Sequence, residues 1–336
     1  MNWELLRELT QAWGVSGREG AVAEIVRREA APYADEIATD ALHNVIVLKR
    51  GAGGGKRIML AAHMDEIGLQ VTKVDGDGKV RVRQVGWVWP AALYNDKVHF
   101  RNGIVGVVGC VGPIEDVRRD IGKLFIDIGC TTKEQAEKYV KVGDMCGLIG
   151  AYHELPEGRV TAKSLDDRIG CLLLLEALKA NDGTLFNDVY YVFSTQEEIG
   201  CRGAQAAAQR ILPDVGLSID VTPDHAYPCD LSGSNTVGEG VAVAFGDPGS
   251  MPDEDVVDTL IACCEKNGLR YQRDVIDRGG TDAQAINLAG CGVRTGAIAV
   301  VTRYPHSQSC LIAKEDAEGA LKLIQAFCRE KLEFIP

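Results

Sequence analysis

Apolar residues recur at helical and strand spacings from the beginning of this 336-residue chain. Residues 2–12 and 19–30 carry apolar side chains on one side of a helix, which predicts two amphipathic helices. Residues 44–49 and 57–62 are short apolar runs on either side of the glycine-rich turn 51–55, and they predict two strands. Together these segments predict the beginning of an α/β domain.

Between residues 70 and 158 the pattern changes to short runs separated by turns. Residues 79–83 alternate between charged and apolar side chains, and residues 103–108 form another short apolar run. Turn sequences such as Asp75-Gly76-Asp77-Gly78 separate these runs. Only residues 132–139 favour a helix here, so we expect residues 70–158 to form a small β-rich domain.

Longer apolar segments return after Lys163. The predicted helices are residues 169–179, 204–209 and 256–267, and the predicted strands are residues 189–194 and 215–220. This alternation predicts an α/β fold with a mainly parallel sheet and helices on both faces. The β-rich segment 70–158 would then be inserted into a single domain built from residues 1–69 and 159–336.

The composition limits which classes of partner and which cellular compartment fit this chain. The formal net charge of -12 argues against nucleic acid or an anionic membrane as the main partner, since both need a basic surface. None of the 11 cysteines forms a Cys-x-x-Cys pair, so neither a disulfide framework nor a zinc ribbon is indicated. The first residues lack the order of a signal peptide, and the longest apolar run, residues 171–175, is too short to span a bilayer. We therefore expect a soluble protein of the cytoplasm.

Two adjacent carboxylates, Glu197 and Glu198, follow the predicted strand 189–194. Burying them unpaired would be costly, so their position indicates either a bound cation or a proton-transfer role. A strand end with two solvated charges is the alternative. Because successive side chains of a strand point to opposite faces, one glutamate can bind a metal while its neighbour acts beside it.

Histidines and carboxylates recur at other predicted strand ends. His63 and Asp65 follow the run 58–62 on one face of the strand, Asp220 ends the run 216–219, and His306 follows the run 298–301. Taken alone, His63 also fits a buried structural histidine. Since ligands of open α/β sheets collect at the carboxyl ends of the strands, we expect these side chains to converge on one crevice.

A further acidic pair, Asp166 and Asp167, precedes the predicted helix that begins near Ile169. One aspartate at this position is an ordinary helix cap. Two are more than a cap requires, which leaves one carboxylate for another role. With the polar residues at the strand ends, the chain has enough ligands for two zinc-type ions that share one bridging carboxylate.

The chain resembles the M42 family of metallo-aminopeptidases nearly from end to end. The motifs that carry the resemblance read GVSGRE, HMDEIG, KSLDDRIG, QEEIG, GGTDA and HS, at residues 14–19, 63–68, 163–170, 196–200, 279–283 and 306–307. The resemblance implies a phosphorylase/hydrolase-like metallopeptidase domain. It also implies two divalent metal ions, with zinc as the first expectation and cobalt or manganese as alternatives.

By the same resemblance, His63 and Asp220 bind one metal, Glu198 and His306 bind the other, and Asp166 bridges the two. Glu197 becomes the general base, which takes a proton from the attacking water and passes it to the leaving amine. Asp65 is similar to the acid that orients the neighbouring histidine. The loop Gly279, Gly280, Thr281 and Asp282 matches a loop near the substrate.

The implied activity is removal of N-terminal residues from short peptides, by subunits that form dimers through residues 70–158 and dodecamers from those dimers. A metal-independent glycoside hydrolase and a catalytically silent scaffold are the alternatives. After His306 the chain departs from the family at Gln308, which can reshape one wall of the pocket. Trp87 and Trp89, in the β-rich segment, are predicted to be core or subunit contacts.

Overall fold

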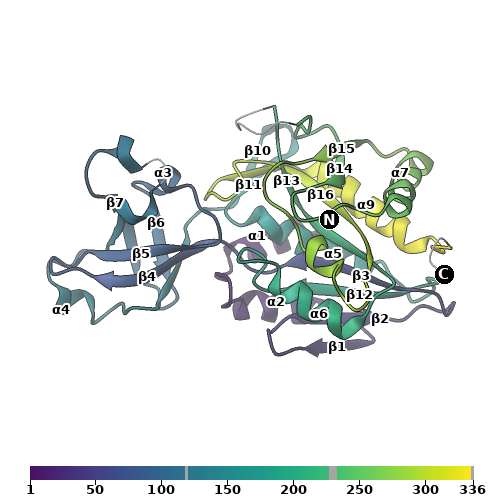
Figure 1. The fold of residues 1–336 in the computed structure, drawn as a ribbon, viewed down its shortest axis with the longest axis horizontal. Coiled ribbons are helices and arrows are strands. Elements are labelled where there is room, and N and C mark those ends of the chain that lie inside the picture. The colour runs from purple at the N-terminus through teal and green to yellow at the C-terminus, as the bar shows by residue number, and fades with distance from the viewer. Residues whose placement is uncertain (118–119, 227–232, 334–336) are drawn as a thin grey trace.

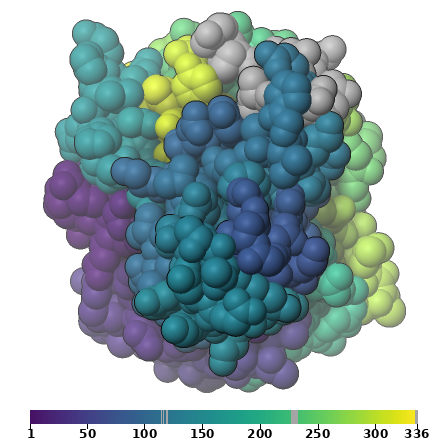
Figure 2. Space-filling view, turned by 90° about the vertical axis from the view of Figure 1, so that its left-hand side faces the viewer, coloured from purple at the N-terminus to yellow at the C-terminus, as the bar shows by residue number. Residues whose placement is uncertain are grey.

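In the computed structural model, which describes residues 1–117, 120–226 and 233–333, the chain forms an α/β body from which a small β-barrel projects (Figure 1). Figure 2 views the molecule with the barrel, in blue and teal, in front of the body. Within those residues, no helix combines the length and apolar character needed to cross a membrane. The body and the barrel have separate hydrophobic cores.

The body is built on one large sheet, in which neighbouring strands follow the order β1-β2-β12-β3-β13-β16-β17-β11-β10, with β14 and β15 joined to it at β16. The strands are β1 (Glu36–Thr39), β2 (Val45–Lys49), β3 (Arg57–His63), β10 (His153–Leu155), β11 (Arg159–Ala162), β12 (Asp188–Ser194), β13 (Val215–Pro223), β14 (Val241–Gly246), β15 (Tyr271–Val275), β16 (Arg294–Arg303) and β17 (Cys310–Ala313).

Helices cover both faces of this sheet, as the sequence predicts. The helices of the body are α1 (Trp3–Gln11), α2 (Gly20–Ala30), α5 (Leu165–Lys179), α6 (Arg202–Ile211), α7 (Glu254–Asn267), α8 (Ala283–Ile286) and α9 (Lys314–Arg329). On one face, α5 packs against β3 and β13, and α9 packs against β16 and α5. On the other face, α6 packs against β12 and β3, and α8 packs against β13 and β16.

Strand β3 shows why the central strands are apolar on both sides. Ile58, Leu60 and Ala62 belong to the core beneath α5, whereas Met59 and Ala61 belong to the core beneath α6. Successive side chains of a strand alternate between faces, so a strand covered on both faces reads as a continuous apolar run. Polar residues begin only where the strand leaves this double cover.

The sheet is mixed, and the prediction of a mainly parallel sheet is not confirmed. Parallel pairing joins the central strands β12, β3, β13 and β16, and β14 with β15. The outer pairs, including β1–β2, β16–β17 and β10–β11, are antiparallel. Their connections are short, such as residues 304–309 between β16 and β17, whereas a parallel crossover needs about a dozen residues or more.

The barrel closes in the order β4-β5-β8-β7-β6-β9. Its strands are β4 (Gly68–Val74), β5 (Val80–Val85), β6 (Lys97–Phe100), β7 (Val105–Cys110), β8 (Leu124–Asp127) and β9 (Met145–Leu148). Its helices are α3 (Pro90–Leu93) and α4 (Lys133–Ala136); three 3-10 turns are η1 (Ile114–Val117), η2 (Ile121–Lys123) and, after β10, η3 (Pro156–Gly158). The short β-rich texture is thus as expected, and the expected helix at 132–139 is limited to a single turn.

Candidate metal centre

Strand register brings the predicted ligands to one edge of the sheet. Strands β12 and β3 run parallel, with Ser194 opposite His63. On the other side of β3, Ser218 of β13 lies opposite Ala61, so Asp220 is level with His63 two residues later. Because these strands end together, Glu197 and Glu198, which follow Ser194, enter the same space. The convergence expected from the sequence is present.

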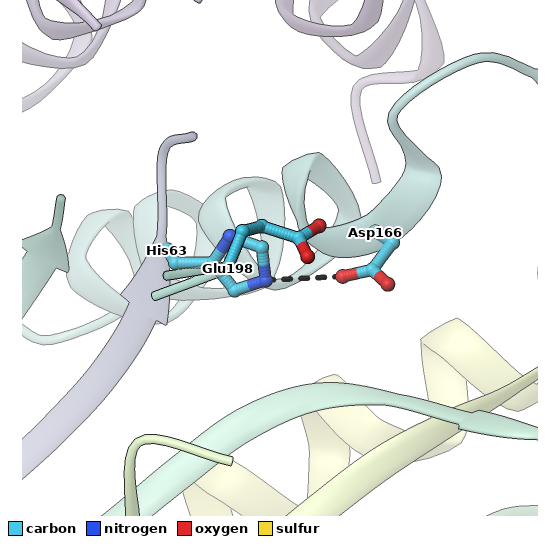
Figure 3. A group of neighbouring side chains, drawn as sticks. All are labelled: His63, Asp166 and Glu198. Carbon is cyan, nitrogen blue, oxygen red and sulfur yellow. Dashed lines mark hydrogen bonds and ion pairs between the residues drawn. The ribbon is translucent and has the colours of Figure 1, made fainter. Parts of the chain in front are cut away.

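Asp166 lies between the two histidines. Its Oδ1 is 3.0 Å from His63 Nε2, and its Oδ2 is 3.2 Å from His306 Nε2. Glu198 Oε2 is 3.5 Å from His306 Nε2, and Asp220 Oδ1 is 3.9 Å from His63 Nε2. Figure 3 shows His63, Asp166 and Glu198 pointing toward one another. Each of the five predicted ligands thus lies within 4 Å of another member of the set.

The second ring nitrogen of each histidine is already engaged. His306 Nδ1 lies 2.6 Å from the carbonyl oxygen of Trp87, and His63 Nδ1 lies 3.2 Å from the carbonyl oxygen of Asp65. A carbonyl oxygen only accepts, so in each neutral imidazole Nδ1 carries the proton and Nε2 presents its lone pair. Fixing the tautomer in this way is typical of histidines that bind metal ions through the other nitrogen.

Carboxylates crowd this site, and burial raises their pKa values. Burial raises the pKa of Glu197 well above its ordinary value, and it does the same to Asp220. Burial and the negative charge of Asp166 raise the pKa of Glu198 to about 7. The cluster therefore holds more negative charge than this buried space tolerates without protons or cations.

The pKa values of the two histidines are raised as well, but by the neighbouring carboxylates and against the effect of burial. Burial would lower the pKa of His306, but the charges of Glu198 and Asp166 raise it to about 10. For His63, too, burial is outweighed, and hydrogen bonds with Asp166 and Asp65 raise its pKa well above the ordinary value. Burial also opposes ionisation of Asp166, yet its contacts with both histidines lower its pKa overall. Two histidines and several carboxylates that compete for protons fit a site built for divalent cations.

Asp167 has the capping role that the sequence left open between the two aspartates. Its Oδ1 accepts a hydrogen bond from the backbone N–H of Gly170 at 3.0 Å, which caps the first turn of α5. Its Oδ2 accepts one from the backbone N–H of His63 at 3.1 Å. Donor atoms of His63, Asp167 and Asp220 also lie within 4.8 Å of one another. Since both Asp167 oxygens already accept backbone N–H groups, Asp166 is the better candidate bridge.

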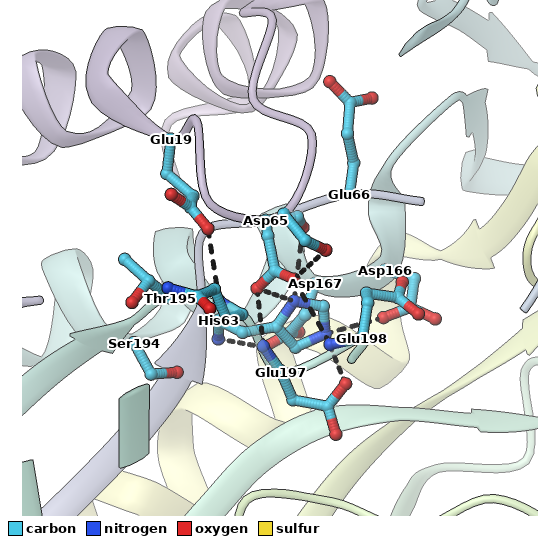
Figure 4. A network of polar contacts seen from close by, with 12 residues as sticks. Glu19, His63, Asp65, Glu66, Asp166, Asp167, Ser194, Thr195, Glu197 and Glu198 are labelled. Carbon is cyan, nitrogen blue, oxygen red and sulfur yellow. Dashed lines mark hydrogen bonds and ion pairs between the residues drawn. The ribbon is translucent and has the colours of Figure 1, made fainter. Parts of the chain in front are cut away.

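Asp65 holds the two glutamates in place rather than facing the space between the histidines. Its Oδ1 accepts from the backbone N–H of Glu197 at 2.9 Å, and its Oδ2 accepts from the backbone N–H of Glu198 at 3.2 Å. The hydroxyl of Ser16 donates to Oδ2 at 2.6 Å. Asp65 is fully buried, and Figure 4 shows it among the residues of the site.

The motif at residues 14–19 thereby gains a structural explanation. Ser16 contacts Asp65, and Glu19 Oε1 accepts a hydrogen bond from the backbone N–H of Gln196 at 3.1 Å (Figure 4). Both contacts act on the segment that carries the two glutamates. The sequence offered this motif as part of a resemblance but assigned no role to Ser16 or Glu19.

Glu197 faces a small polar group on its other side. Its Oε2 is 4.0 Å from His63 Nε2, and its Oε1 accepts a hydrogen bond from the thiol of Cys201 at 3.2 Å. Gln284 Nε2 donates to the sulfur of Cys201 at 3.1 Å. The sequence did not predict this contact between Cys201 and Glu197.

The predicted substrate loop divides into a buried and an exposed part. Asp282 is buried and accepts a hydrogen bond from the hydroxyl of Ser194 at 2.5 Å, and the carbonyl of Thr281 contacts Cys201 Sγ at 3.5 Å. Gly279 and Gly280 lie farther out on the loop, where Gly280 faces the side chain of Gln284. Thr281 and Asp282 therefore lie next to Glu197, on the side where Glu197 contacts Cys201.

Left-handed backbone conformations mark the segments that carry the site. Ser164, Gln196 and His306 have φ values of 54, 57 and 54°. A side chain other than glycine in this region costs roughly 1–3 kcal/mol, which the surrounding structure must overcome. Such strain concentrates where side chains are held for a function, and here it lies at or beside predicted ligands.

The barrel also contributes to the site, which the sequence did not predict. Gly86 lies against Glu198, and the carbonyl of Trp87 holds His306. Trp87 and Trp89 are 48% and 43% exposed, so the core position is wrong for both, and the subunit contact that was the alternative stays a prediction. A pocket at the site is lined by residues that include Asp166, Glu198 and His306.

The chain is similar to known proteins over nearly its whole length. The family model for M42 glutamyl aminopeptidase matches residues 43–323. A candidate aminopeptidase of Acetivibrio thermocellus is 36% identical over 328 residues, which cover 97% of this chain and 98% of that protein. The aminopeptidase APDkam598 from the archaeon Desulfurococcus kamchatkensis has a similar structure, with a TM-score of 0.93, 35% identity and coverage of 99% of this chain and 96% of that chain.

A further solved structure, the TET1 peptidase of Pyrococcus horikoshii, which can assemble into a tetrahedron or a large octahedral shell, matches with a TM-score of 0.86 and 34% identity. The match covers 98% of this chain and 99% of that chain. These similarities extend over nearly the whole chain, and the family model includes His63, Asp166, Glu197, Glu198, Asp220 and His306. The chain belongs to the M42 family of aminopeptidases, as its sequence motifs predict.

Proposed function

We propose that the chain is a dinuclear metal aminopeptidase that removes N-terminal residues from short peptides. His63 and Asp220 would hold one divalent cation, Glu198 and His306 the other, and Asp166 would bridge the two. When bound, two such cations polarise the scissile carbonyl and make a water molecule more acidic. Zinc suits this mixed set of imidazoles and carboxylates, with cobalt and manganese as alternatives.

The observation that carries the proposal is the position of Asp166 between the histidines. Its two oxygens lie 3.0 and 3.2 Å from the Nε2 atoms of His63 and His306, whose Nδ1 atoms both face backbone carbonyls. Lone pairs and a carboxylate repel one another unless a proton or a cation lies between them. One carboxylate with one oxygen directed at each histidine is the arrangement expected of a bridging ligand.

Glu197 is the proposed general base. Its carboxylate is within 4.0 Å of His63, and the backbone N–H of Glu197 is fixed by Asp65. Burial raises its pKa well above the ordinary value, which favours a group that accepts and returns a proton. Glu197 would accept the proton of the attacking water and donate it to the leaving amine. Thr281 and Asp282, which lie next to Glu197, would support this side of the substrate site.

A metal-independent glycoside hydrolase is a weaker explanation of this site. That reaction needs two carboxyl groups on either side of one bond. Here Glu197 faces Cys201 and His63, whereas Glu198 faces His306. A glycosidase mechanism also leaves the two oriented histidines without a role. A catalytically silent scaffold is disfavoured because each of the proposed ligands is retained.

The deciding experiment compares Glu197→Gln with Asp166→Ala. Glu197→Gln should bind the same amount of metal as the unchanged chain but lose turnover of aminoacyl anilides, because only the proton acceptor is removed. Asp166→Ala should lose metal, because the bridge is removed. The exposed Glu24→Gln on α2 is the matched control and should retain both properties. Equal metal loss in Glu197→Gln and Asp166→Ala, or activity that survives complete metal removal, would contradict the assignment.

We further propose that residues 70–158 are an inserted dimerisation unit, and that dimers assemble into a dodecamer. The closed barrel, residues 68–148, has its own core and supports a separate unit, whereas β10 (His153–Leu155) at the end of the proposed range pairs with β11 in the large sheet. The shells formed by the TET1 peptidase support assembly of this kind. Light scattering that gives the mass of a monomer at micromolar concentration would contradict this part. The free thiols at every described cysteine support a reducing compartment, the cytoplasm.

A further inference from the structure

The proposed metal site is open to solvent beside His306. The side chain of His306 is 23% exposed. The other proposed ligands are more buried, with side chains that are 10% exposed for Asp166, 7% for Asp220, 5% for Glu198 and 2% for His63. His306 is therefore the proposed ligand that is most accessible to a substrate.

An exposed aromatic pair lies at this opening. The ring of Trp87 packs at 5.7 Å from the ring of His306, with the planes inclined by 51°. The ring of Trp89 lies edge-on against Trp87, with centroids 4.4 Å apart. These indoles are 48% and 43% exposed. Two exposed indoles in contact form an apolar patch next to a strongly charged site, and such a patch usually marks a place where something binds.

The backbone that carries this pair is fixed against the site. The carbonyl of Trp87 accepts the hydrogen bond of His306 Nδ1 at 2.6 Å. Gly86 has a φ of 72°, and a Cβ there would lie 2.8 Å from Ile67 Cγ2 and 3.1 Å from Glu198 Cβ. The preceding residue thus packs directly on one proposed ligand while Trp87 holds another. The indoles are held at a defined place relative to the metals, as a specificity wall requires.

The segment after His306 strengthens this contact. The side chain of Gln308 donates to the carbonyl of Ala92 at 3.4 Å and also contacts the carboxylate of Asp96. Both contacts join the loop that carries His306 to the barrel segment that carries the two tryptophans, so the wall and the ligand move together.

The charge around the opening favours an apolar side chain over an acidic one. The cation nearest to the site in the pocket lining is Lys163, which is only 3% exposed and forms an ion pair with Glu66 at 2.6 Å. Because Lys163 is already paired with Glu66, the residues that line the pocket offer no unpaired lysine or arginine to an acidic side chain. An aromatic or branched aliphatic side chain would instead bury its surface against the indoles, at about 25 cal/mol per Å².

We propose that Trp87 and Trp89 form the wall that receives a large apolar side chain next to the scissile bond, and so set the substrate preference. The inference rests on the proposed aminopeptidase activity and adds its substrate class. Trp87 acts through its indole, since its carbonyl contact with His306 is independent of its side chain. The barrel would then supply the specificity of a reaction carried out by residues of the body.

The test compares Trp87→Ala, Trp89→Ala and the milder Trp87→Phe in the full metal-loaded chain. The kcat/KM values for leucyl, phenylalanyl, alanyl and glutamyl anilides are measured for each. The ratio of leucyl to alanyl kcat/KM should fall about tenfold in both alanine variants, mainly through KM, and less in Trp87→Phe. Tyr139→Ala is the control, because Tyr139 is 51% exposed on the barrel near α4, at the end away from the body (Figure 1), and its ratio should not change.

Dipeptides then identify which substrate residue meets the wall. Leucyl-alanine and alanyl-leucine are compared, and loss of discrimination at the first or the second residue assigns the contact. Unchanged ratios in both tryptophan variants would overturn the proposal. If the mass of the assembly also falls in those variants, the pair belongs to a subunit contact instead. Absence of hydrolysis by the unchanged chain with every metal would overturn the proposed activity itself, and the wall with it.

Discussion

Replacing Asp65 by asparagine tests whether this residue positions the two glutamates or only supports the fold. In the native site the carboxylate accepts hydrogen bonds from Ser16 Oγ and from the backbone N–H groups of Glu197 and Glu198. An amide has the same shape but only one oxygen. The change therefore removes one acceptor while leaving the packing of the buried side chain nearly unchanged.

The cost follows from which acceptor is lost. If the amide nitrogen replaces Oδ2, Ser16 can rotate its hydroxyl to accept, but the N–H of Glu198 faces another N–H. If it replaces Oδ1, the N–H of Glu197 loses its partner instead. Either way a buried N–H is left unsatisfied, at a cost of about 1–3 kcal/mol. Movement of the segment away from this contact would displace the base or a ligand, and such supporting contacts are worth about 10–100-fold in metal affinity or activity.

The assay combines kcat/KM on a leucyl anilide, metal content and the thermal unfolding midpoint. Asp65→Asn should lose about 10–100-fold in kcat/KM. Ser16→Ala is the matched control, because it removes the hydroxyl and leaves both backbone N–H groups with their acceptors. It should lose no more than about threefold, as a hydrogen bond worth about 0.5–1 kcal/mol implies. An Asp65→Asn enzyme that keeps its kcat/KM within about twofold while its midpoint falls would refute the positioning role.

The remaining predictions concern three contacts of the same site and the removal of its metal. Asp167→Ala should lower the free energy of unfolding by about 1–2 kcal/mol, measured by urea denaturation, because α5 loses its cap. Cys201→Ala should lower kcat with little change in KM, and Cys201→Ser should restore it, because the hydroxyl replaces the donor to Glu197. Gly86→Ala should reduce metal content, because its Cβ meets Ile67 and displaces Glu198. Chelation should lower the unfolding midpoint, since metal at a hundredfold excess over Kd contributes about 2.7 kcal/mol, and Asp166→Ala should show no such shift.

The sequence predicts the centre of the fold better than its edges, for a physical reason. Central strands such as β3 are buried on both faces, so their apolar runs are continuous and bounded by the polar residues that follow them. Edge strands such as β1 and β10 are mostly exposed and carry little apolar signal. Their antiparallel pairing depends on the short connections, and the sequence pattern does not reveal which strands those connections join.

Four of the proposed ligands, His63, Glu198, Asp220 and His306, were accessible to prediction because each follows an apolar run and because parallel strands end at one edge. The division of labour between Asp166 and Asp167 was not, because both precede the same helix. Only the three-dimensional positions of the Gly170 and His63 N–H groups distinguish the cap from the candidate bridge.

The contact between the barrel and His306 shows where prediction from strand ends stops. Trp87 holds His306 through a backbone carbonyl, and every residue has a backbone carbonyl, so no side-chain pattern marks this role. Trp87 and His306 are 219 residues apart in the sequence, and the chain between them includes the rest of the inserted segment and much of the body. The insertion therefore does more than add a separate unit to the body. His306 is held by Trp87, and Glu198 packs against Gly86. Any shift of the barrel relative to the body therefore changes the proposed second metal subsite. An assembly that fixes the barrels would also fix this subsite, so metal affinity should depend on the oligomeric state.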